Sequence, residues 1–156
     1  MSRVIRPVRP DDPVQAHIAA IYGEFGLEFD PAFEDDLEDV MASYRTGAFW
    51  VVEGHGPRAD GGPPAIAATA AVLPHGGARV IKRIYVAKEA RRGGLARDLV
   101  RRCAAWGDFV RTELWSDVRF RSAHRLYLSE GFVQGPVRVL EDPDRSVERY
   151  FFRDAR

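Results

Sequence analysis

Apolar residues recur along this chain with two different periods, and the alternation between them predicts the order of its helices and strands. Helical spacing is found over residues 14–25 and 31–44. Each segment has an aspartate followed by a proline at its start, Asp12-Pro13 and Asp30-Pro31, which favour the beginning of a helix. It returns over 95–106 and 122–130. Branched and aromatic residues typical of strands occupy 4–9, 48–52, 65–73, 79–86, 112–116, 132–140 and 147–152.

The predicted order is therefore βααβββαβαββ, an α/β (α+β) fold with a central mixed sheet flanked by helices. The strands are too interleaved with helices for a β-sandwich. A chain of 156 residues has the size of one compact domain, and no repeat or low-complexity segment divides it. We expect a single domain spanning 1–156, with a loop at 54–64, where four glycines and three prolines gather.

Composition narrows the class of protein without naming a function. Hydrophobic residues make up 46% and charged residues 29%, as in ordinary globular chains, and a single cysteine permits no internal disulfide. The longest nearly apolar run, 65–73, is far shorter than the roughly 20 residues of a membrane span. The start of the chain carries charges and a proline where a signal peptide has an apolar core. We therefore expect a cytoplasmic protein without a membrane partner.

Charge is balanced overall and polarised locally. The 23 basic and 23 acidic side chains cancel, which argues against a nucleic-acid partner. Residues 24–39 nevertheless contain eight acids and no base, whereas 91–102 contain five arginines and one acid. The first segment could face a cation and the second an anion, and both could equally be solvated helix faces.

The segment 80–99 carries the clearest chemistry. A branched strand is followed by Arg91-Arg92-Gly93-Gly94-Leu95-Ala96, which opens a helix with small residues. Unpaired N–H groups at a helix N-terminus favour an anion, and small residues let it approach the backbone, so a pyrophosphate-sized site is predicted. The alternative is a tight turn that needs glycine for its dihedral angles. Neither a Rossmann nor a P-loop glycine pattern is present.

The pattern Arg91-x-x-Gly94-x-Ala96 resembles the acyl-CoA signature Arg/Gln-x-x-Gly-x-Gly/Ala of the GNAT N-acetyltransferase superfamily. The run 126–132, Leu-Tyr-x-x-x-Gly-Phe, looks like the second conserved block of that family, and the element order matches over nearly the whole chain. The resemblance implies a GNAT-like acyl-CoA N-acyltransferase fold, with the sheet splayed between strands 79–86 and 112–116. It also implies acetyl-CoA as cosubstrate and direct transfer of an acetyl group to a primary amine in a ternary complex.

The resemblance further assigns cofactor-binding residues. The pantetheine arm would pair with the exposed backbone of the strand at Ile84, Tyr85 and Val86. Arg91 would open the turn, and the pyrophosphate would be held by the backbone amides of Arg92, Gly93, Gly94, Leu95 and Ala96. The acceptor amine would arrive from the opposite side of the sheet.

Tyr127 is the expected general acid, because the family often uses this tyrosine to protonate the leaving thiolate. It could instead be a core tyrosine. Many relatives carry a glutamate as base early in strand 79–86, where this chain has Val80. The general base is then a water molecule, Asp117, Glu28 or His124. His124 is a candidate because it lies three residues before Tyr127 and can share its helix face.

Other features limit or extend this interpretation. Phe120 stands where relatives often have an asparagine that contacts the cofactor. Four scattered histidines show no metal-site spacing, and Cys103 lies on a predicted buried helix face, so neither a metal nor a covalent intermediate is expected. The acceptor is a small-molecule or peptide amine of unknown identity, and the aromatic strand 150–152 could pair with a second copy in a homodimer. The alternative function is a catalytically degenerate acyl-CoA-binding sensor or interaction module.

Overall fold

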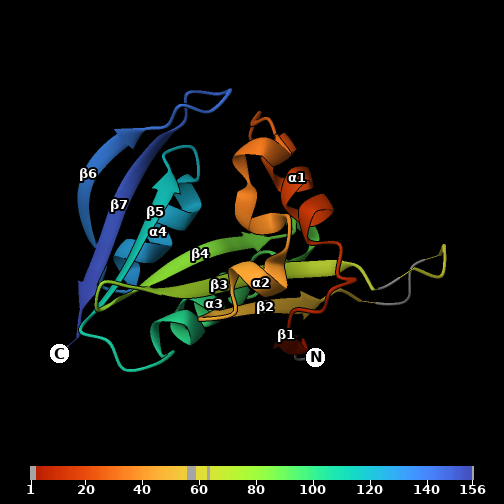
Figure 1. Cartoon of the computed structure of the whole chain (residues 1–156), viewed down its shortest axis with the longest axis horizontal. Coiled ribbons are helices and arrows are strands. Elements are labelled where there is room, and N and C mark those ends of the chain that lie inside the picture. Colours follow the sequence, from red (N-terminus) through yellow and green to blue (C-terminus); the bar gives the residue numbers. More distant parts are fainter. Residues whose placement is uncertain (1–2, 56–58, 63, 156) are drawn as a thin grey trace.

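The computed structural model describes residues 3–55, 59–62 and 64–155, so residues 56–58 and 63 of the predicted loop lie outside the described part. Its centre is a seven-stranded sheet in the order β1-β2-β3-β4-β5-β7-β6 (Figure 1). Every predicted strand is present, and its ends lie within two residues of the prediction. The strands are β1 Ile5–Pro7, β2 Ala48–Glu53, β3 Ile66–His75, β4 Ala78–Val86, β5 Arg111–Asp117, β6 Val133–Val139 and β7 Val147–Asp154.

Three of the four predicted helices form as expected: α1 Val14–Glu24, α3 Leu95–Ala104 and α4 Arg121–Ser129. The prediction of one helix over 31–44 was wrong. That segment contains two 3-10 turns, η1 Pro31–Phe33 and η2 Asp35–Leu37, and a short helix α2 Val40–Ser43. The backbone leaves the helical conformation at Glu34 and again at Asp39, and the Asp39 side chain caps the next turn by accepting the Ala42 N–H. Such local caps compete with a continuous helix.

The sheet has a hydrophobic core on each face. On one face Leu99 and Cys103 of α3 and Tyr127 of α4 pack against strand residues such as Leu114 and Phe151. On the other face a second core is built around α1 and the η1–α2 segment. The packed stripes of α3 and α4 are those that the sequence predicts, whereas Phe33 and Met41 of the stripe predicted over 31–44 are exposed. No helix in the described ranges is long and apolar enough to cross a membrane.

The sheet opens between β4 and β5, as the family resemblance implies. These strands are parallel and pair over three residues only, from Ala78 opposite Arg111 to Val80 opposite Glu113. By contrast β5 pairs with β7 along its whole length. Beyond Val80 the β5–β7–β6 part of the sheet therefore diverges from β4 (Figure 1).

A bulge in β4 shapes the edge of this opening. Thr69 lies opposite Tyr85 but Ala71 lies opposite Lys82, so one residue of β3 faces two of β4. The extra residue is Arg83, whose φ of 58° is left-handed. Because of the bulge, Ile81 and Ile84 both pack with the α3–α4 core although they are three residues apart, while Tyr85 packs with the core around α1 and Arg83 reaches Tyr22 of α1.

Candidate functional site

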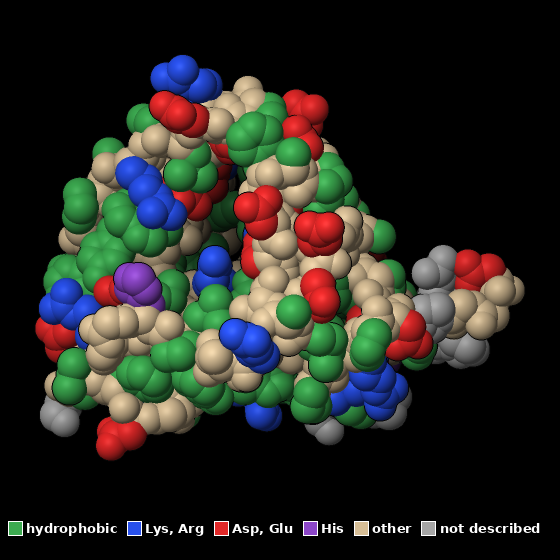
Figure 2. All heavy atoms as spheres, in the orientation of Figure 1, with side chains coloured by type: hydrophobic (Ala, Val, Ile, Leu, Met, Phe, Trp, Pro, Cys, Tyr) green, Lys and Arg blue, Asp and Glu red, His purple; other side chains and the backbone are tan. Residues whose placement is uncertain are grey.

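A cleft of about 1130 Å³ fills the opening between β4 and β5. Its walls come from α1 and the η1–η2 segment on one side, and from β5, α4 and the β6–β7 turn on the other. Figure 2 shows it as a hollow at the middle of the molecule, with acidic side chains along the rim formed by the segment after α1. Its size is that of a site for a drug-sized or larger ligand.

The exposed edge of β4 offers backbone groups to the cleft. The Ala87 N–H donates to the Ala67 carbonyl and Tyr85 pairs with Thr69. Because the backbone groups of successive strand residues point to opposite sides, those of Ile84 and Val86 point into the opening. The Tyr85 carbonyl accepts a hydrogen bond from His17 at 3.0 Å. Of the three predicted strand contacts, Ile84 and Val86 therefore present their backbone to the cleft, and Tyr85 presents its side chain.

The start of α3 forms one end of the cleft. Gly94 precedes the helix with a φ of 80°, and no side chain caps the first turn. The first amides of α3 are therefore not bound by a capping side chain. Of the predicted anion-site residues, Arg91, Arg92, Gly94, Leu95 and Ala96 line the cleft and Gly93 does not.

The arginines around α3 are mostly paired within the protein. Arg97 and Arg101 both bind Glu130 at the end of α4, and Arg102 lies over the ring of Trp50. Arg91 binds Glu24 and donates to the Val86 carbonyl at 3.0 Å. Within the described ranges Arg92 makes no such contact, which leaves its guanidinium available to an anion.

Tyr127 lies on the α4 side of the opening. It is buried against Phe151 and Phe132 and lines the cleft. Burial raises the pKa of the phenol, so Tyr127 carries its proton at neutral pH. A protonated hydroxyl at this point is what a general acid requires.

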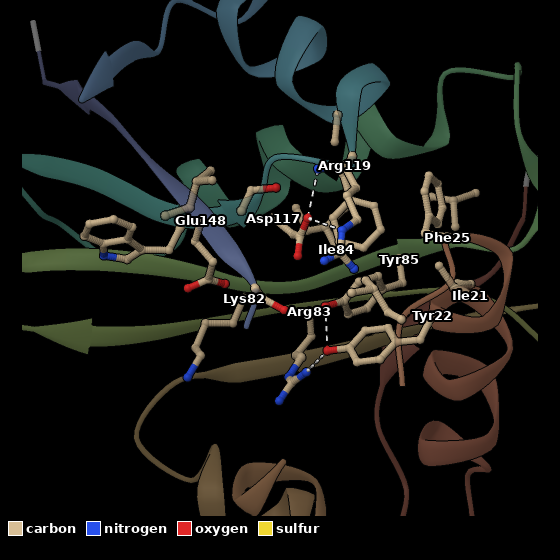
Figure 3. A pocket seen from close by; sticks show the side chains of 18 of the residues that line it. Ile21, Tyr22, Phe25, Lys82, Arg83, Ile84, Tyr85, Asp117, Arg119 and Glu148 are labelled. Atoms are coloured by element: carbon tan, nitrogen blue, oxygen red, sulfur yellow. Dashed lines mark hydrogen bonds and ion pairs between the residues drawn. The ribbon is translucent and has the colours of Figure 1, made fainter. Parts of the chain in front are cut away.

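Two carboxylates line the cleft from the face of β5 and β7 that is turned away from α4. Asp117 of β5 is the cross-strand partner of Glu148 of β7, and both point into the cleft (Figure 3). Asp117 accepts the Arg119 N–H at 2.8 Å, and Glu148 is bound by Arg138 at 2.7 Å. Because side chains alternate along a strand, Asp117 faces away from the side of β5 that carries Ser116. Tyr127 and the two carboxylates therefore line the same cleft from opposite faces of β5.

The wall next to α1 is held by Arg83. Its guanidinium is buried and donates to the Tyr22 hydroxyl at 3.2 Å (Figure 3). It also forms ion pairs with Glu34 and Asp36. Burial would lower the pKa of Arg83, but the hydrogen bonds and negative charge around it raise that pKa instead. The acidic segment is therefore divided. Arg83 neutralises Glu34 and Asp36, whereas the nearby Asp35, Glu38 and Asp39 are exposed to solvent.

A sequence profile of the acetyltransferase (GNAT) domain matches residues 45–134, more than half of the chain. The chain belongs to the GNAT acetyltransferase family. No curated protein sequence gives a significant match. Solved structures with the same fold include a GNAT acetyltransferase from Staphylococcus aureus Mu50, which is 19% identical with a TM-score of 0.77 over 98% of this chain and 99% of that one.

An acetyltransferase from Streptococcus agalactiae 2603 is 20% identical, with a TM-score of 0.76 over 98% of each chain. A spermidine N-acetyltransferase from Vibrio cholerae, solved with CoA and spermine, is 16% identical, with a TM-score of 0.65 over 97% of this chain and 95% of that one. At these identities the likeness shows the GNAT fold.

The remaining predicted residues of this GNAT protein are placed as follows. Asp117 and Glu28 line the cleft, but His124 does not, because its ring lies behind Ser116. Phe120 packs edge-on against Phe25 with ring centroids 4.7 Å apart, closing one end of the cleft with aromatic surface. The apolar ring of Phe120 cannot form the hydrogen bond that an asparagine at this position would make to the cofactor.

Cys103 is fully buried, and burial raises the pKa of its thiol to about 12, so its thiolate is scarce at neutral pH. Within the described ranges no group of three metal-ligating side chains could hold a metal ion. Sequence reasoning missed Glu148, Ser116 and Glu24. Glu24 and Glu148 lie beside residues that are distant in sequence, and Ser116 meets a residue of the following helix, so no local motif marks any of the three.

Proposed function

We propose that this GNAT protein transfers an acetyl group from acetyl-CoA to a primary amine of a small molecule or peptide by direct attack in a ternary complex. One observation carries the proposal: the opening between β4 and β5 has the uncapped start of α3 at one end, a buried protonated tyrosine on one face and two carboxylates on the other. The Vibrio cholerae neighbour, solved with CoA and spermine, supports it by its fold.

The residues present suit an acyl-CoA. The pyrophosphate would lie at the amides of residues 92–96, with the Arg92 guanidinium beside it, where helix N-termini favour anions. The pantetheine amides would pair with the edge of β4 at Ile84 and Val86, as an added strand pairs with a sheet edge. The thioester would then reach the middle of the opening.

The side chains around the opening divide the chemistry between them. A primary amine is protonated at neutral pH and must lose a proton before it attacks. Asp117 and Glu148 attract the ammonium, and Asp117 or a water held by it removes the proton. Tyr127 gives its phenol proton to the thiolate as it leaves. The Cys103 thiol is buried outside the cleft, so it takes no part in this transfer.

Binding is tested with one charge in the predicted pyrophosphate site. Ala96 lines the cleft in the first turn of α3, where an acidic side chain favours the helix. We expect calorimetric titration with acetyl-CoA to give micromolar binding for the wild type. Ala96→Glu should weaken that binding about a hundredfold or more, and the neutral isostere Ala96→Gln should weaken it far less. A folded wild type that does not bind acetyl-CoA would overturn the proposal.

Turnover is tested by release of the CoA thiol with a panel of amines, including spermidine and short peptides with free N-termini. Thiol release that falls about a hundredfold in Tyr127→Phe, while acetyl-CoA affinity persists, supports the transferase. The alternative is an acyl-CoA-binding module without turnover. Val80 favours it, because this residue lines the cleft without a carboxylate where many relatives carry a glutamate. Binding without thiol release from any amine would support that module.

A further inference from the structure

Ser116 occupies a buried position between the expected acid and a histidine. It is next to last in β5 and faces α4, so its hydroxyl lies among the side chains of that helix. The His124 Nε2 lies 3.1 Å from the Ser116 Oγ. The His124 ring packs edge-on against Phe151, with ring centroids 4.8 Å apart at 77°, which fixes its orientation. The histidine is thus held in place on Ser116 and lies outside the cleft.

The other neighbour of Ser116 is Tyr127. Burial raises the pKa of the Tyr127 phenol, and an interaction with the nearby Ser116 hydroxyl acts in the opposite direction. His124 and Tyr127 are three residues apart on one face of α4, with ring centroids 6.3 Å apart. Ser116 therefore lies at the cleft wall with Tyr127, and His124 is bound to its hydroxyl from the side away from the cleft.

We propose that His124 and Ser116 are positioning residues that align the Tyr127 hydroxyl as a proton donor toward the cleft. The proposal rests on the acetyltransferase function proposed above. In the proposed series of hydrogen bonds, the His124 Nε2–H donates to Ser116 Oγ, and the Ser116 O–H donates to Tyr127 Oη. The Tyr127 hydrogen is then left free to point at the position of the thioester sulfur. Ser116 lines the cleft wall and His124 lies behind it, and both act through Tyr127.

The arrangement addresses a cost that burial imposes on Tyr127. When the C–S bond breaks, its electron pair goes to sulfur and the phenol proton moves to that sulfur, which leaves a phenolate in an apolar site. A buried phenolate is unfavourable unless a donor stabilises it. The Ser116 O–H supplies this donor, and hydrogen bonds in series strengthen one another. The phenolate then regains its proton from solvent after the products leave.

The test uses two pairs of variants that differ in the hydrogen-bonding group. Ser116→Ala removes the hydroxyl and Ser116→Thr keeps it, whereas His124→Leu removes the donor and His124→Gln keeps an N–H at a similar place. We expect Ser116→Ala and His124→Leu each to lower kcat about tenfold, with KM and acetyl-CoA affinity within about twofold of wild type. Ser116→Thr and His124→Gln should retain most of kcat. Urea unfolding of every variant identifies any that do not fold.

A double-mutant cycle with Tyr127→Phe separates positioning from general damage. If Ser116 acts through Tyr127, Ser116→Ala should cause no further loss of kcat in the Tyr127→Phe background. A wild-type kcat in Ser116→Ala would overturn the positioning role of Ser116 and leave the proposed acetyltransferase function intact. The same fractional loss of kcat in the wild-type and Tyr127→Phe backgrounds would do so as well. A wild type that binds acetyl-CoA but releases no thiol with any amine would overturn the transferase and this inference with it.

Discussion

The guanidinium of Arg91 binds both carboxylate oxygens of Glu24, at 2.8 and 3.1 Å. Glu24 is the last residue of α1, and Arg91 begins the turn that leads into α3. The pair therefore ties the wall next to α1 to the predicted pyrophosphate loop. It also places a carboxylate beside the site where an acyl-CoA would bring negative charge.

We expect Glu24→Gln to tighten acetyl-CoA binding by about two- to fivefold, because it removes a negative charge that competes for Arg91. The pair is about one-third exposed, so the effect is small and should shrink further at about 0.5 M salt. Calorimetric titration at two salt concentrations measures it. Glu89→Gln, which removes an exposed carboxylate close by in sequence, is the control. Weaker binding in Glu24→Gln would show that the ion pair serves to orient Arg91.

Two adjacent glycines in the predicted pyrophosphate loop differ in their backbone. Gly94 has a φ of 80°, whereas Gly93 lies outside the left-handed region, and a Cβ at either position meets no atom within 4 Å. Gly94→Ala should therefore lower the free energy of unfolding by about 1 kcal/mol through backbone strain. Gly93→Ala should leave it unchanged or raise it by a few tenths of a kcal/mol. Urea unfolding measures both, and equal losses would contradict strain as the cause.

Breaking the Arg83 network should cost stability in a pH-dependent way. Burial would raise the pKa of Asp36, but hydrogen bonds and charge from Arg83 outweigh it and lower that pKa. The carboxyl has a pKa of about 3.9 when unfolded, so its contribution is present above about pH 4 and is lost as pH falls through the lower folded value. Arg83→Gln should lower the free energy of unfolding at pH 7 by about 3–5 kcal/mol.

The double variant Arg83→Gln/Asp36→Asn serves as the control for that prediction. Removing the stranded carboxylate should recover part of the loss at pH 7. Its unfolding free energy should also vary less than that of the wild type between about pH 5 and pH 3. Urea unfolding across this range tests both points. A double variant that is no more stable than Arg83→Gln would show that the cost comes from lost packing or from Glu34.

The sequence predicts most of the fold because local pattern decides most of it. Strands with branched residues and helices with a continuous apolar stripe lie within two residues of their expected ends. The prediction for segment 31–44 is wrong because its apolar spacing is that of a helix, whereas its backbone is non-helical at Glu34 and at Asp39, which caps a new turn. Whether an aspartate caps or continues a helix depends on which backbone conformation tertiary packing selects, and the pattern does not contain that choice.

The candidate site likewise contains residues that the sequence predicts and residues that only the structure reveals. The loop at 91–96 and Tyr127 can be found from sequence, because each lies in a short motif that resembles a family pattern. Glu148 has no such motif, since it meets Asp117 only through the register of β5 and β7. Ser116 likewise matters only because His124 and Tyr127 project onto it from α4. Register and helix rotation are tertiary properties, so these residues become candidates once the structure places them.

Asp117 and Glu148 should be separable by their effects on the acceptor. Asp117 also holds the β5–α4 turn through the Arg119 N–H, whereas Glu148 is bound by the Arg138 side chain alone among the described residues. Glu148→Gln therefore removes charge with little effect on the backbone. We expect it to raise KM for a protonated amine about tenfold, since a charge-assisted contact is lost, with acetyl-CoA affinity unchanged.

Steady-state kinetics with the amine that gives the fastest thiol release measures this difference. Glu113→Gln is the matched control, because Glu113 lies on the same face of β5 outside the cleft and binds the Tyr150 hydroxyl. Asp117→Asn should lower kcat as well as raise KM if Asp117 removes the amine proton, and that loss should be smaller for acceptors with a lower amine pKa. A Glu148→Gln enzyme with the wild-type KM would show that the acceptor ammonium binds elsewhere in the cleft. Glu28 would then be the next carboxylate to replace, because it lines the rim on the side of α1.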